Sequence, residues 1–288
     1  MRFPYDQFGV PGRQPPVTDT LVTRNLSAGT DMNLPKITVV TCSYNQGRFL
    51  EETILSVVNQ GYPNLEYIVI DGGSRDNSVD IIRKYEKYLA HWVSEPDNGQ
   101  SDALAKGFER STGEILCWLC SDDLLEENAL LEVGRLFSGD ASLEVVFGDT
   151  VFIDERGAVT RHYRTLPFNR WLLLNTANYI PQPSTFWRKG IYEQAGGLDR
   201  SLLMGLDPDL WLRFSDITRL RHVRRYWSRM RIYPEIKSLT LNDEKWADHR
   251  RLERRYLGPR SEPVRRATRA LAKAMRVGYK VCLGCYWP

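Results

Sequence analysis

Four clusters of small and polar residues contain many of the side chains in this sequence that could do chemistry. They span residues 43–47, 71–76, 94–100 and 121–123, and three of them are rich in carboxylates. Carboxylates that lie close together repel one another unless a cation or a hydrogen-bond donor lies between them. Mg²⁺ and Mn²⁺ prefer oxygen ligands of this kind. The clusters therefore predict a divalent cation beside a diphosphate, with other carboxylates accepting hydrogen bonds from a base or a ribose.

The alternative for each cluster is ordinary turn and helix-cap chemistry, to which Ser, Asp, Asn and Gly are equally suited. Any single cluster fits either interpretation, whereas four in succession favour a binding site. The sequence has no G-x-x-x-x-G-K-[ST] segment and no G-x-G-x-x-G after its first predicted strand. A P-loop and a dinucleotide fingerprint are therefore excluded.

Each cluster follows a predicted β-strand. Short apolar or β-branched runs predict strands over residues 37–41, 65–70, 91–93, 115–119 and 144–147. Helical spacing of apolar residues predicts helices over residues 49–58, 74–90, 101–110 and 126–137. Strands that alternate with helices indicate a parallel sheet covered on both faces. Ligands bind such sheets outside the carboxyl ends of the strands, so the four clusters should meet at one edge. Beyond residue 150 we expect a hairpin over 151–163 and mixed loops and helices over 171–216.

The ordered set of motifs resembles the family 2 glycosyltransferases, which have the GT-A fold. The matching blocks are VVTCSYN at 39–45, FLEETILSV at 49–57, YIVIDGGSRD at 67–76, EPDNG at 95–99, SDD at 121–123, PQPSTF at 181–186, GLD at 197–199 and LDPDLWLR at 206–213. Each block is weak evidence by itself, but the set in this order is specific. The resemblance covers about residues 36–240.

The resemblance implies an α/β fold of GT-A type: a mostly parallel, Rossmann-like sheet flanked by helices, with an acceptor-side extension and a basic helical C-terminal tail. We therefore divide the chain into an irregular arm (1–34), a glycosyltransferase domain (35–240) and the tail (241–288). Within the domain, residues 35–150 would bind the nucleotide sugar and residues 151–240 the acceptor. The implied reaction moves a sugar, with inversion, from a nucleotide-diphosphate donor to a hydroxyl of a glycan, glycolipid or other glycoconjugate. UDP-sugars are the expected donors.

The resemblance also implies a role for each site residue. Asp207 would be the general base, Asp123 would bind Mg²⁺ or Mn²⁺, and the nucleotide-sugar pocket would contain Ser43, Asn45, Asp71, Glu95, Asp97 and Asp122. These roles suit the chemistry, because a metal neutralises the leaving diphosphate and a carboxylate takes the acceptor proton. Asp207 and Asp209 flank Pro208, so we expect only one of them to face the cleft. The alternative for Asp207 and for Asp123 is to cap the helix that follows.

One departure concerns the metal ligands. Many relatives have a late His that can complete the metal shell, and the corresponding block here, YPEIKS at 233–238, has none. Glu235 could replace it, or the diphosphate and water could supply the remaining ligands. His249 is a more distant candidate, for which a surface helix position is the simpler interpretation. On the acceptor side, one or two aromatic residues should line the groove, the candidates being Trp171, Tyr179, Phe186, Trp187 and Trp211.

Two other functions compete with sugar transfer. A catalytically silent sugar- or nucleic-acid-binding protein could use the same fold, but intact Asp71, Asp122, Asp123 and Asp207 argue against lost activity. A nucleotidyltransferase that makes nucleotide sugars should have a Gly-rich, basic N-terminal loop. Residues 43–48 contain only one basic side chain, Arg48, which makes this function less favoured.

The net charge of +3 conceals an asymmetry. Residues 1–218 hold 20 Lys and Arg against 30 Asp and Glu, whereas residues 219–288 hold 19 against 6. At residues 262–288, cationic and apolar residues mix at helical spacing. This pattern predicts either an interfacial anchor on an anionic membrane or a solvated helix packed on the body. Nucleic acid is not an expected partner.

The composition limits where the protein acts. Of the 288 residues, 42% are hydrophobic, enough for a large core, yet no apolar run approaches the ~18 residues that span a bilayer. The first ten residues do not resemble a secretory signal. An odd count of five cysteines favours reduced thiols. We expect a cytoplasmic enzyme, with the inner face of the cell membrane as the alternative location.

Overall fold

The computed structural model describes residues 34–285, apart from the side chains of residues 242–246. All but the last residue of the predicted arm, residues 1–34, lies outside the described residues, as do the last three residues of the tail. The described chain is built on one mixed sheet with the strand order β3-β2-β1-β4-β8-β6-β9-β5, and β7 pairs with β6.

The first half of the sheet is parallel. Its strands are β1 (Ile37–Ser43), β2 (Leu65–Asp71), β3 (His91–Ser94) and β4 (Ile115–Cys120). The helices that connect them are α1 (Gly47–Val58), α2 (Ser78–Tyr85) with the 3₁₀ turn η1 (Glu86–Tyr88), and α3 (Gln100–Arg110). The predicted βαβ units are confirmed. All seven residues of β1 are buried, as expected of a strand covered on both faces.

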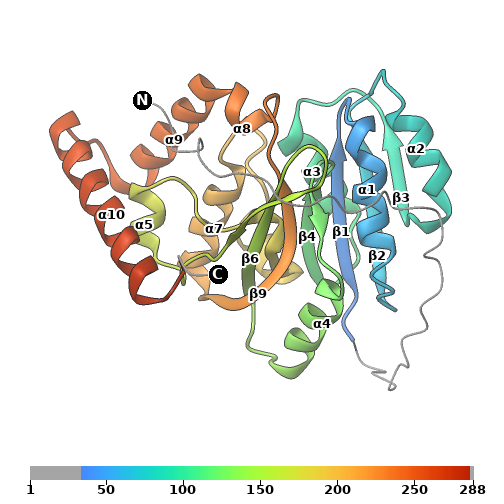
Figure 1. The fold of residues 1–288 in the computed structure, drawn as a ribbon, viewed down its shortest axis with the longest axis horizontal. Coiled ribbons are helices and arrows are strands. Elements are labelled where there is room, and N and C mark those ends of the chain that lie inside the picture. Colours follow the sequence, from blue (N-terminus) through green and yellow to red (C-terminus); the bar gives the residue numbers. More distant parts are fainter. Residues whose placement is uncertain (1–33, 286–288) are drawn as a thin grey trace. The chain divides into compact units, whose positions relative to one another are not determined.

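The handedness of the crossover connections determines which face of the sheet each of these helices covers. The chain moves outward from β1 to β2 and β3, then returns to β4 on the other side of β1. Because parallel crossovers are right-handed, α1 and α2 cover one face of the sheet and α3 covers the other. α3 packs on β1 and β2, and α1 packs against α2. Figure 1 shows these helices at the β3 end of the sheet, with α10 at the opposite end.

The second half of the sheet is mixed. β6 (Val145–Ile153) and β7 (Val159–Tyr163) form the predicted hairpin. β8 (Thr185–Arg188) lies antiparallel between β4 and β6, β9 (Leu220–Arg231) runs parallel to β6, and β5 (Leu124–Leu125) closes the edge. Neither β8 nor β9 is predicted from the sequence. β9 carries five arginines, which look like a solvated segment, yet it lies between β6 and β5.

The remaining helices cover this mixed half. They are α4 (Ala129–Gly139), α5 (Arg170–Asn175), η2 (Gln182–Ser184), α6 (Lys189–Gln194), α7 (Leu206–Ile217), α8 (Lys237–Thr240), α9 (Asn242–Leu257) and α10 (Glu262–Cys282). α7 contacts β9, α5 and α6, while α5 also contacts α9 and α10. Within residues 34–285, none of the helices is both long enough and apolar enough to cross a bilayer.

One predicted helix is too long. The spacing predicts a helix over residues 74–90, but α2 begins only at Ser78. The preceding turn is held by side chains, because Asp71 accepts hydrogen bonds from the main-chain N–H groups of Gly73 and Ser74. Asp76 accepts one from the N–H of Ser78 (3.0 Å). The carboxylates thus take donors that a longer helix would leave without partners.

Aromatic side chains fill the core between the sheet and α7. The rings of Trp118 and Trp211 stack with centroids 5.8 Å apart, and Trp187 packs edge-on against both. Of the five aromatic residues expected on the acceptor side, Tyr179, Phe186, Trp187 and Trp211 are buried. Core packing therefore explains these four, and Trp171, which is half-buried, is the one left for an acceptor groove.

Candidate active site

The ends of the first three strands meet as predicted. In the sheet register Ser43 pairs with Asp71, and Asp71 pairs with Ser94. Asp71 is fully buried and accepts hydrogen bonds from Ser74 Oγ (2.5 Å) and Ser94 Oγ (2.7 Å). Its carboxylate is thus used within the fold. Ser43 Oγ, in contrast, is buried without a hydrogen-bond partner among the described residues, which is a reason to look for a ligand there.

The other predicted pocket residues lie in loops next to these strand ends. Asn45 has a left-handed backbone (φ 51°), and its side chain accepts a hydrogen bond from Arg75 N (2.9 Å). Glu95 is exposed and pairs with Lys106 at 3.4 Å. Asp97 accepts a hydrogen bond from Gly99 N (2.7 Å) just before α3. These contacts fix the loops and leave Glu95 facing solvent at their rim.

A second acidic group lies where β4 ends. The potential ligand atoms of Cys120, Asp122 and Asp123 all lie within 4.8 Å of one another. Burial, and after it repulsion by Asp122, raises the pKa of Asp123 well above its usual range. Burial also raises the pKa of Asp122, against a hydrogen bond from Tyr233 that lowers it. A buried carboxylate beside a partly buried one fits a divalent cation, and their oxygens are ligands that Mg²⁺ and Mn²⁺ accept.

The aspartates are held by residues that the sequence analysis misses. Arg231, at the end of β9, has no exposed surface, and its main-chain N–H donates to Asp123 Oδ1 (3.0 Å). Its guanidinium donates to the carbonyl oxygen of Asp122 (3.0 Å). Tyr233 Oη donates to Asp122 Oδ2 (2.8 Å). The sequence signal for this contact is the first residue of the YPEIKS block. This tyrosine approaches the acidic pair, in a block that lacks the histidine of many relatives.

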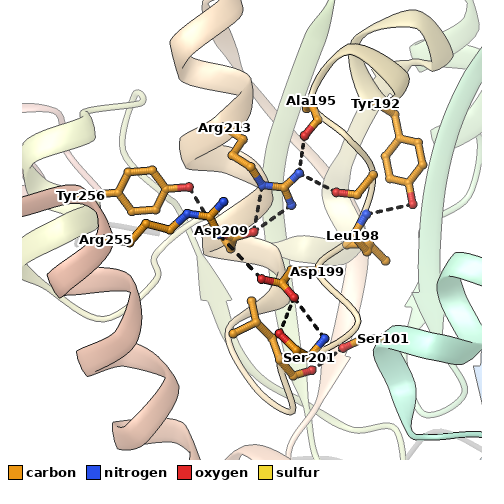
Figure 2. A network of polar contacts seen from close by, with 12 residues as sticks. Ser101, Tyr192, Ala195, Leu198, Asp199, Ser201, Asp209, Arg213, Arg255 and Tyr256 are labelled. Carbon is orange, nitrogen blue, oxygen red and sulfur yellow. Dashed lines mark hydrogen bonds and ion pairs between the residues drawn. The ribbon is translucent and has the colours of Figure 1, made fainter.

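Asp207 and Asp209 have different surroundings. Asp209 is fully buried between Arg213 (2.7 Å), Arg255 (3.3 Å) and the Tyr256 hydroxyl (3.2 Å), a network shown in Figure 2. Asp207 is half-buried, and Asn178 Nδ2 donates to its Oδ2 at 2.6 Å. Asp209 is therefore a structural carboxylate enclosed by cations, whereas Asp207 remains partly exposed.

The capping alternative is wrong for both aspartates. α7 has Gly205 at its N-cap, in a left-handed conformation (φ 71°), so Asp207 lies within the first turn. α4 has Asn128 at its N-cap, five residues beyond Asp123. Neither carboxylate occupies the position from which a side chain caps a helix.

The remaining ligand candidates lie elsewhere. Glu235 is exposed and pairs with Arg48 (3.3 Å). His249 lines a small cavity of about 30 Å³ with Asn178 and Pro208, which places it on the side of Asp207. Glu235 is thus paired with Arg48, and Asp122 and Asp123 are the carboxylates that lie together at the end of β4.

Comparisons with known proteins identify the domain. The sequence profile of glycosyl transferase family 2 matches residues 38–196. An uncharacterised glycosyltransferase of Mycobacterium tuberculosis is 29% identical over 181 residues, which are 62% of this chain and 68% of that protein. The putative teichuronic acid biosynthesis glycosyltransferase TuaG of Bacillus subtilis is 36% identical over 99 residues, 33% of this chain and 39% of TuaG.

Solved structures give the same fold at low identity. TarS 1–349 of Staphylococcus aureus, in complex with UDP-GlcNAc, has a TM-score of 0.62 at 15% identity and covers 82% of this chain and 71% of its own. The mannosyltransferase PcManGT of Pyrobaculum calidifontis, in complex with GDP-Man and Mn²⁺, has a TM-score of 0.57 at 17% identity, covering 84% and 70%. These structures confirm the predicted α/β fold of GT-A type. With more than half of its length matched by the profile, the chain belongs to glycosyl transferase family 2.

Proposed function

We propose that this protein transfers a sugar from a nucleotide-diphosphate donor to a hydroxyl of a glycan, glycolipid or other glycoconjugate, with inversion at the anomeric carbon. Residues 35–150 would hold the donor and residues 151–240 the acceptor. UDP-sugars are the donors to test first, with GDP-sugars second. The two solved structures named above are complexes with one donor of each kind, UDP-GlcNAc and GDP-Man.

The observation that best supports this proposal is the contrast between Asp207 and Asp209. Two arginines and a tyrosine surround the fully buried Asp209, so its oxygens already have partners within the fold. Asp207, two residues away, meets the amide of Asn178 and is partly open to solvent. A general base needs a carboxylate that a substrate hydroxyl can reach. Of these two aspartates, Asp207 is the one suited to that role.

The reaction requires a single displacement. The carboxylate of Asp207 takes the proton of the acceptor hydroxyl while the hydroxyl oxygen forms a bond to the anomeric carbon. The bond from that carbon to the diphosphate oxygen breaks at the same time, and its electron pair leaves with the diphosphate. Attack opposite to the leaving group inverts the anomeric centre and needs no covalent intermediate.

The acidic pair at the end of β4 would serve the donor. Asp123 would ligate Mg²⁺ or Mn²⁺ and Asp122 would approach the ribose or the diphosphate, while Arg231 and Tyr233 hold the two carboxylates in place. When bound, the metal supplies positive charge that neutralises the diphosphate as it leaves. Ser43, Asn45, Asp71, Glu95 and Asp97 would line the rest of the nucleotide pocket.

The experiment that tests this proposal is transfer by Asp207→Asn in a donor screen with Mn²⁺. We expect turnover to fall by about 10²–10⁴-fold because the base is lost. Donor binding, measured by thermal shift, should persist because Asp207 would contact the acceptor. The matched control is Asp216→Asn on the same helix, which removes an exposed carboxylate paired with Arg170 (3.0 Å) and should retain turnover.

Near-normal turnover by Asp207→Asn would reject Asp207 as the base. Turnover of none of the common nucleotide sugars by the wild-type protein would instead favour a binding protein on this fold. The stereochemistry of the product, read by NMR, tests inversion separately.

We further propose that α10 contacts the anionic inner face of a membrane, where the protein would act as a peripheral enzyme. The helix packs on the body through its cationic side. Arg269 pairs with Glu253 (3.1 Å), Arg276 donates to Tyr163 Oη (3.0 Å), and Lys280 lies over the Tyr163 ring (4.4 Å). The helix is therefore packed on the body, as one interpretation of the tail predicts. Its opposite side is the one that would contact the membrane, as the other interpretation predicts.

The outward side of α10 is apolar. Leu271, Val277 and Val281 are each more than half exposed. At 100° per residue these three and Ala267, Ala270 and Ala274 fall within an arc of about 120°. Arg266, with 80% of its side chain exposed, lies beside that arc. An apolar strip bordered by cations suits an anionic lipid surface.

Co-sedimentation with vesicles tests this contact. Wild-type protein should bind vesicles that contain phosphatidylserine and bind phosphatidylcholine vesicles less. Val277→Asp with Val281→Asp should abolish the binding, whereas Val159→Asp, at an equally exposed valine of β7, should not. If the double variant sediments like wild type, α10 is not the contact. If it instead converts a dimer into a monomer in solution, the strip joins two copies of the chain.

A further inference from the structure

Lys237 brings a positive charge close to the acidic pair at the end of β4, and its own hydrogen-bond partners are neutral. The side chain is half-buried at the start of α8. Its Nζ donates to Gln100 Oε1 (3.2 Å) and to the carbonyl oxygen of Leu203 (2.7 Å), both neutral acceptors. No described carboxylate forms an ion pair with it. An ammonium group has three donors, so one remains for a further partner.

The position of Lys237 relative to the acidic pair follows from one shared residue. The side-chain amide of Gln100 accepts from Lys237 and donates through Nε2 to Cys120 Sγ (3.2 Å). Cys120 in turn belongs to the group with Asp122 and Asp123. The ammonium is therefore two hydrogen bonds from the candidate cation ligands.

The second contact of Lys237 points toward the acceptor side. Leu203 belongs to the segment that leads into α7, on which Asp207 lies. Gln100 is the first residue of α3, whose N-terminus adds partial positive charge on the other side. Lys237 thus lies between the strand end where the diphosphate would bind and the segment that carries the proposed base.

We propose that Lys237 Nζ binds the diphosphate of the nucleotide-sugar donor. This inference rests on the proposed function and adds a residue to its donor site. A partly desolvated ammonium recovers solvation best from an oxyanion, and phosphate oxygens form short, charge-assisted hydrogen bonds with it. Burial lowers the pKa of Lys237 in the present arrangement, and a bound diphosphate would favour the charged form. The same charge would stabilise the diphosphate as it takes the electron pair of the broken bond.

The test compares two ligands that differ only in phosphate. The dissociation constants of UDP and uridine are measured for wild-type protein, Lys237→Met and Lys237→Arg, by calorimetry for UDP and ligand-observed NMR for uridine. In Lys237→Met we expect UDP to bind at least about tenfold more weakly, with uridine unchanged. Lys237→Arg should recover most of the UDP affinity because it keeps the charge.

Lys189→Met is the matched control. Lys189 is also a partly exposed lysine that donates to a main-chain carbonyl, that of Ser111 (2.7 Å), but it is the first residue of α6. The Lys189→Met variant should bind UDP and uridine with wild-type affinity. Melting temperatures of all three variants show whether each is folded.

Each outcome decides the inference. Equal UDP affinity in wild type and Lys237→Met overturns it and leaves the proposed function standing. Parallel loss of UDP and uridine also overturns it, because Lys237 would then only hold the cleft together. Wild-type protein that binds neither UDP nor GDP, and transfers from neither kind of donor, overturns the proposed function itself.

Discussion

Arg231 offers a test of how the acidic pair is held. Its guanidinium has no exposed surface and donates to three main-chain carbonyl groups, those of Asp122 (3.0 Å), Asp154 (3.3 Å) and Glu155 (2.9 Å). It also donates to Glu52 Oε2 (2.6 Å). One side chain thus joins the loop after β4 to the β6–β7 turn and to α1.

The expected cost of Arg231→Met can be worked from these contacts. A hydrogen bond within a folded protein contributes about 0.5–1.5 kcal/mol to stability. Glu52 has 57% of its side chain exposed and would return to water, so it adds little. At about 1 kcal/mol for each of the three bonds to carbonyl groups, the loss is about 3 kcal/mol. For a domain of this size that corresponds to a fall in melting temperature of about 6–12 °C.

Arg229→Met is the matched comparison on the same strand. Arg229 forms a bidentate pair with Glu126 (2.9 Å for each bond), but 41% of its side chain is exposed. A solvent-screened pair contributes about 0.2–1 kcal/mol. Its loss should therefore lower the melting temperature by no more than about 4 °C.

The assay is thermal unfolding of both variants, followed by circular dichroism and repeated by chemical denaturation. If Arg231→Met and Arg229→Met lose the same stability, the reasoning from the buried guanidinium is refuted, because the exposure of the arginine would then make no difference.

Three further predictions follow from single residues. Hydrogen bonds from Thr112, Thr38 and Lys36 outweigh burial and lower the pKa of Glu66 to about 2. The charged Glu66 should therefore stabilise the fold above its ordinary pKa of about 4.5, and this stabilisation should be lost as the pH falls toward 2. Glu66→Gln should accordingly melt below wild type at pH 7 and converge with it at pH 2–3; a constant difference across that range would contradict the assignment. Asp123→Asn should abolish the rise in melting temperature that Mn²⁺ gives with UDP, and addition of EDTA to wild type should do the same; an undiminished Mn²⁺ effect in the variant would place the metal elsewhere. Ser43→Ala removes a buried hydroxyl that has no partner among the described residues, so it should not lower the melting temperature but should weaken UDP binding several-fold, and unchanged UDP affinity would argue against a ligand at Ser43.

The first half of the fold is predictable because its signals are local. Buried parallel strands such as β1 and β2 read as continuous apolar runs, and the polar residues that follow them mark the strand ends. Register then brings Ser43, Asp71 and Ser94 side by side, as the sheet rule requires. The boundary of α2 is missed because side chains of the preceding turn decide it.

The second half depends on contacts between distant residues. β9 pairs with β6, about 75 residues earlier, and its arginines conceal the alternation that predicts a strand. Arg231 and Tyr233 contact the acidic pair from more than a hundred residues away, and Lys237 is linked to it only through Gln100, so spacing could not associate them with it. Likewise, Asp207 and Asp209 are the same residue type, and the burial of Asp209 between Arg213 and Arg255 distinguishes them in the structure.

These contacts change the interpretation of the charge asymmetry in the sequence. Much of the basic segment 219–288 does not form a separate tail, since Arg229, Arg231 and Arg255 each pair with an acidic residue of the preceding body. These ion pairs neutralise part of both excesses within the fold. A cation that is already paired contributes little to a distant anion, so the excess of charge overstates what is available to a partner. The cation to examine is therefore Lys237, whose hydrogen bonds go to neutral acceptors and with which no described carboxylate forms an ion pair.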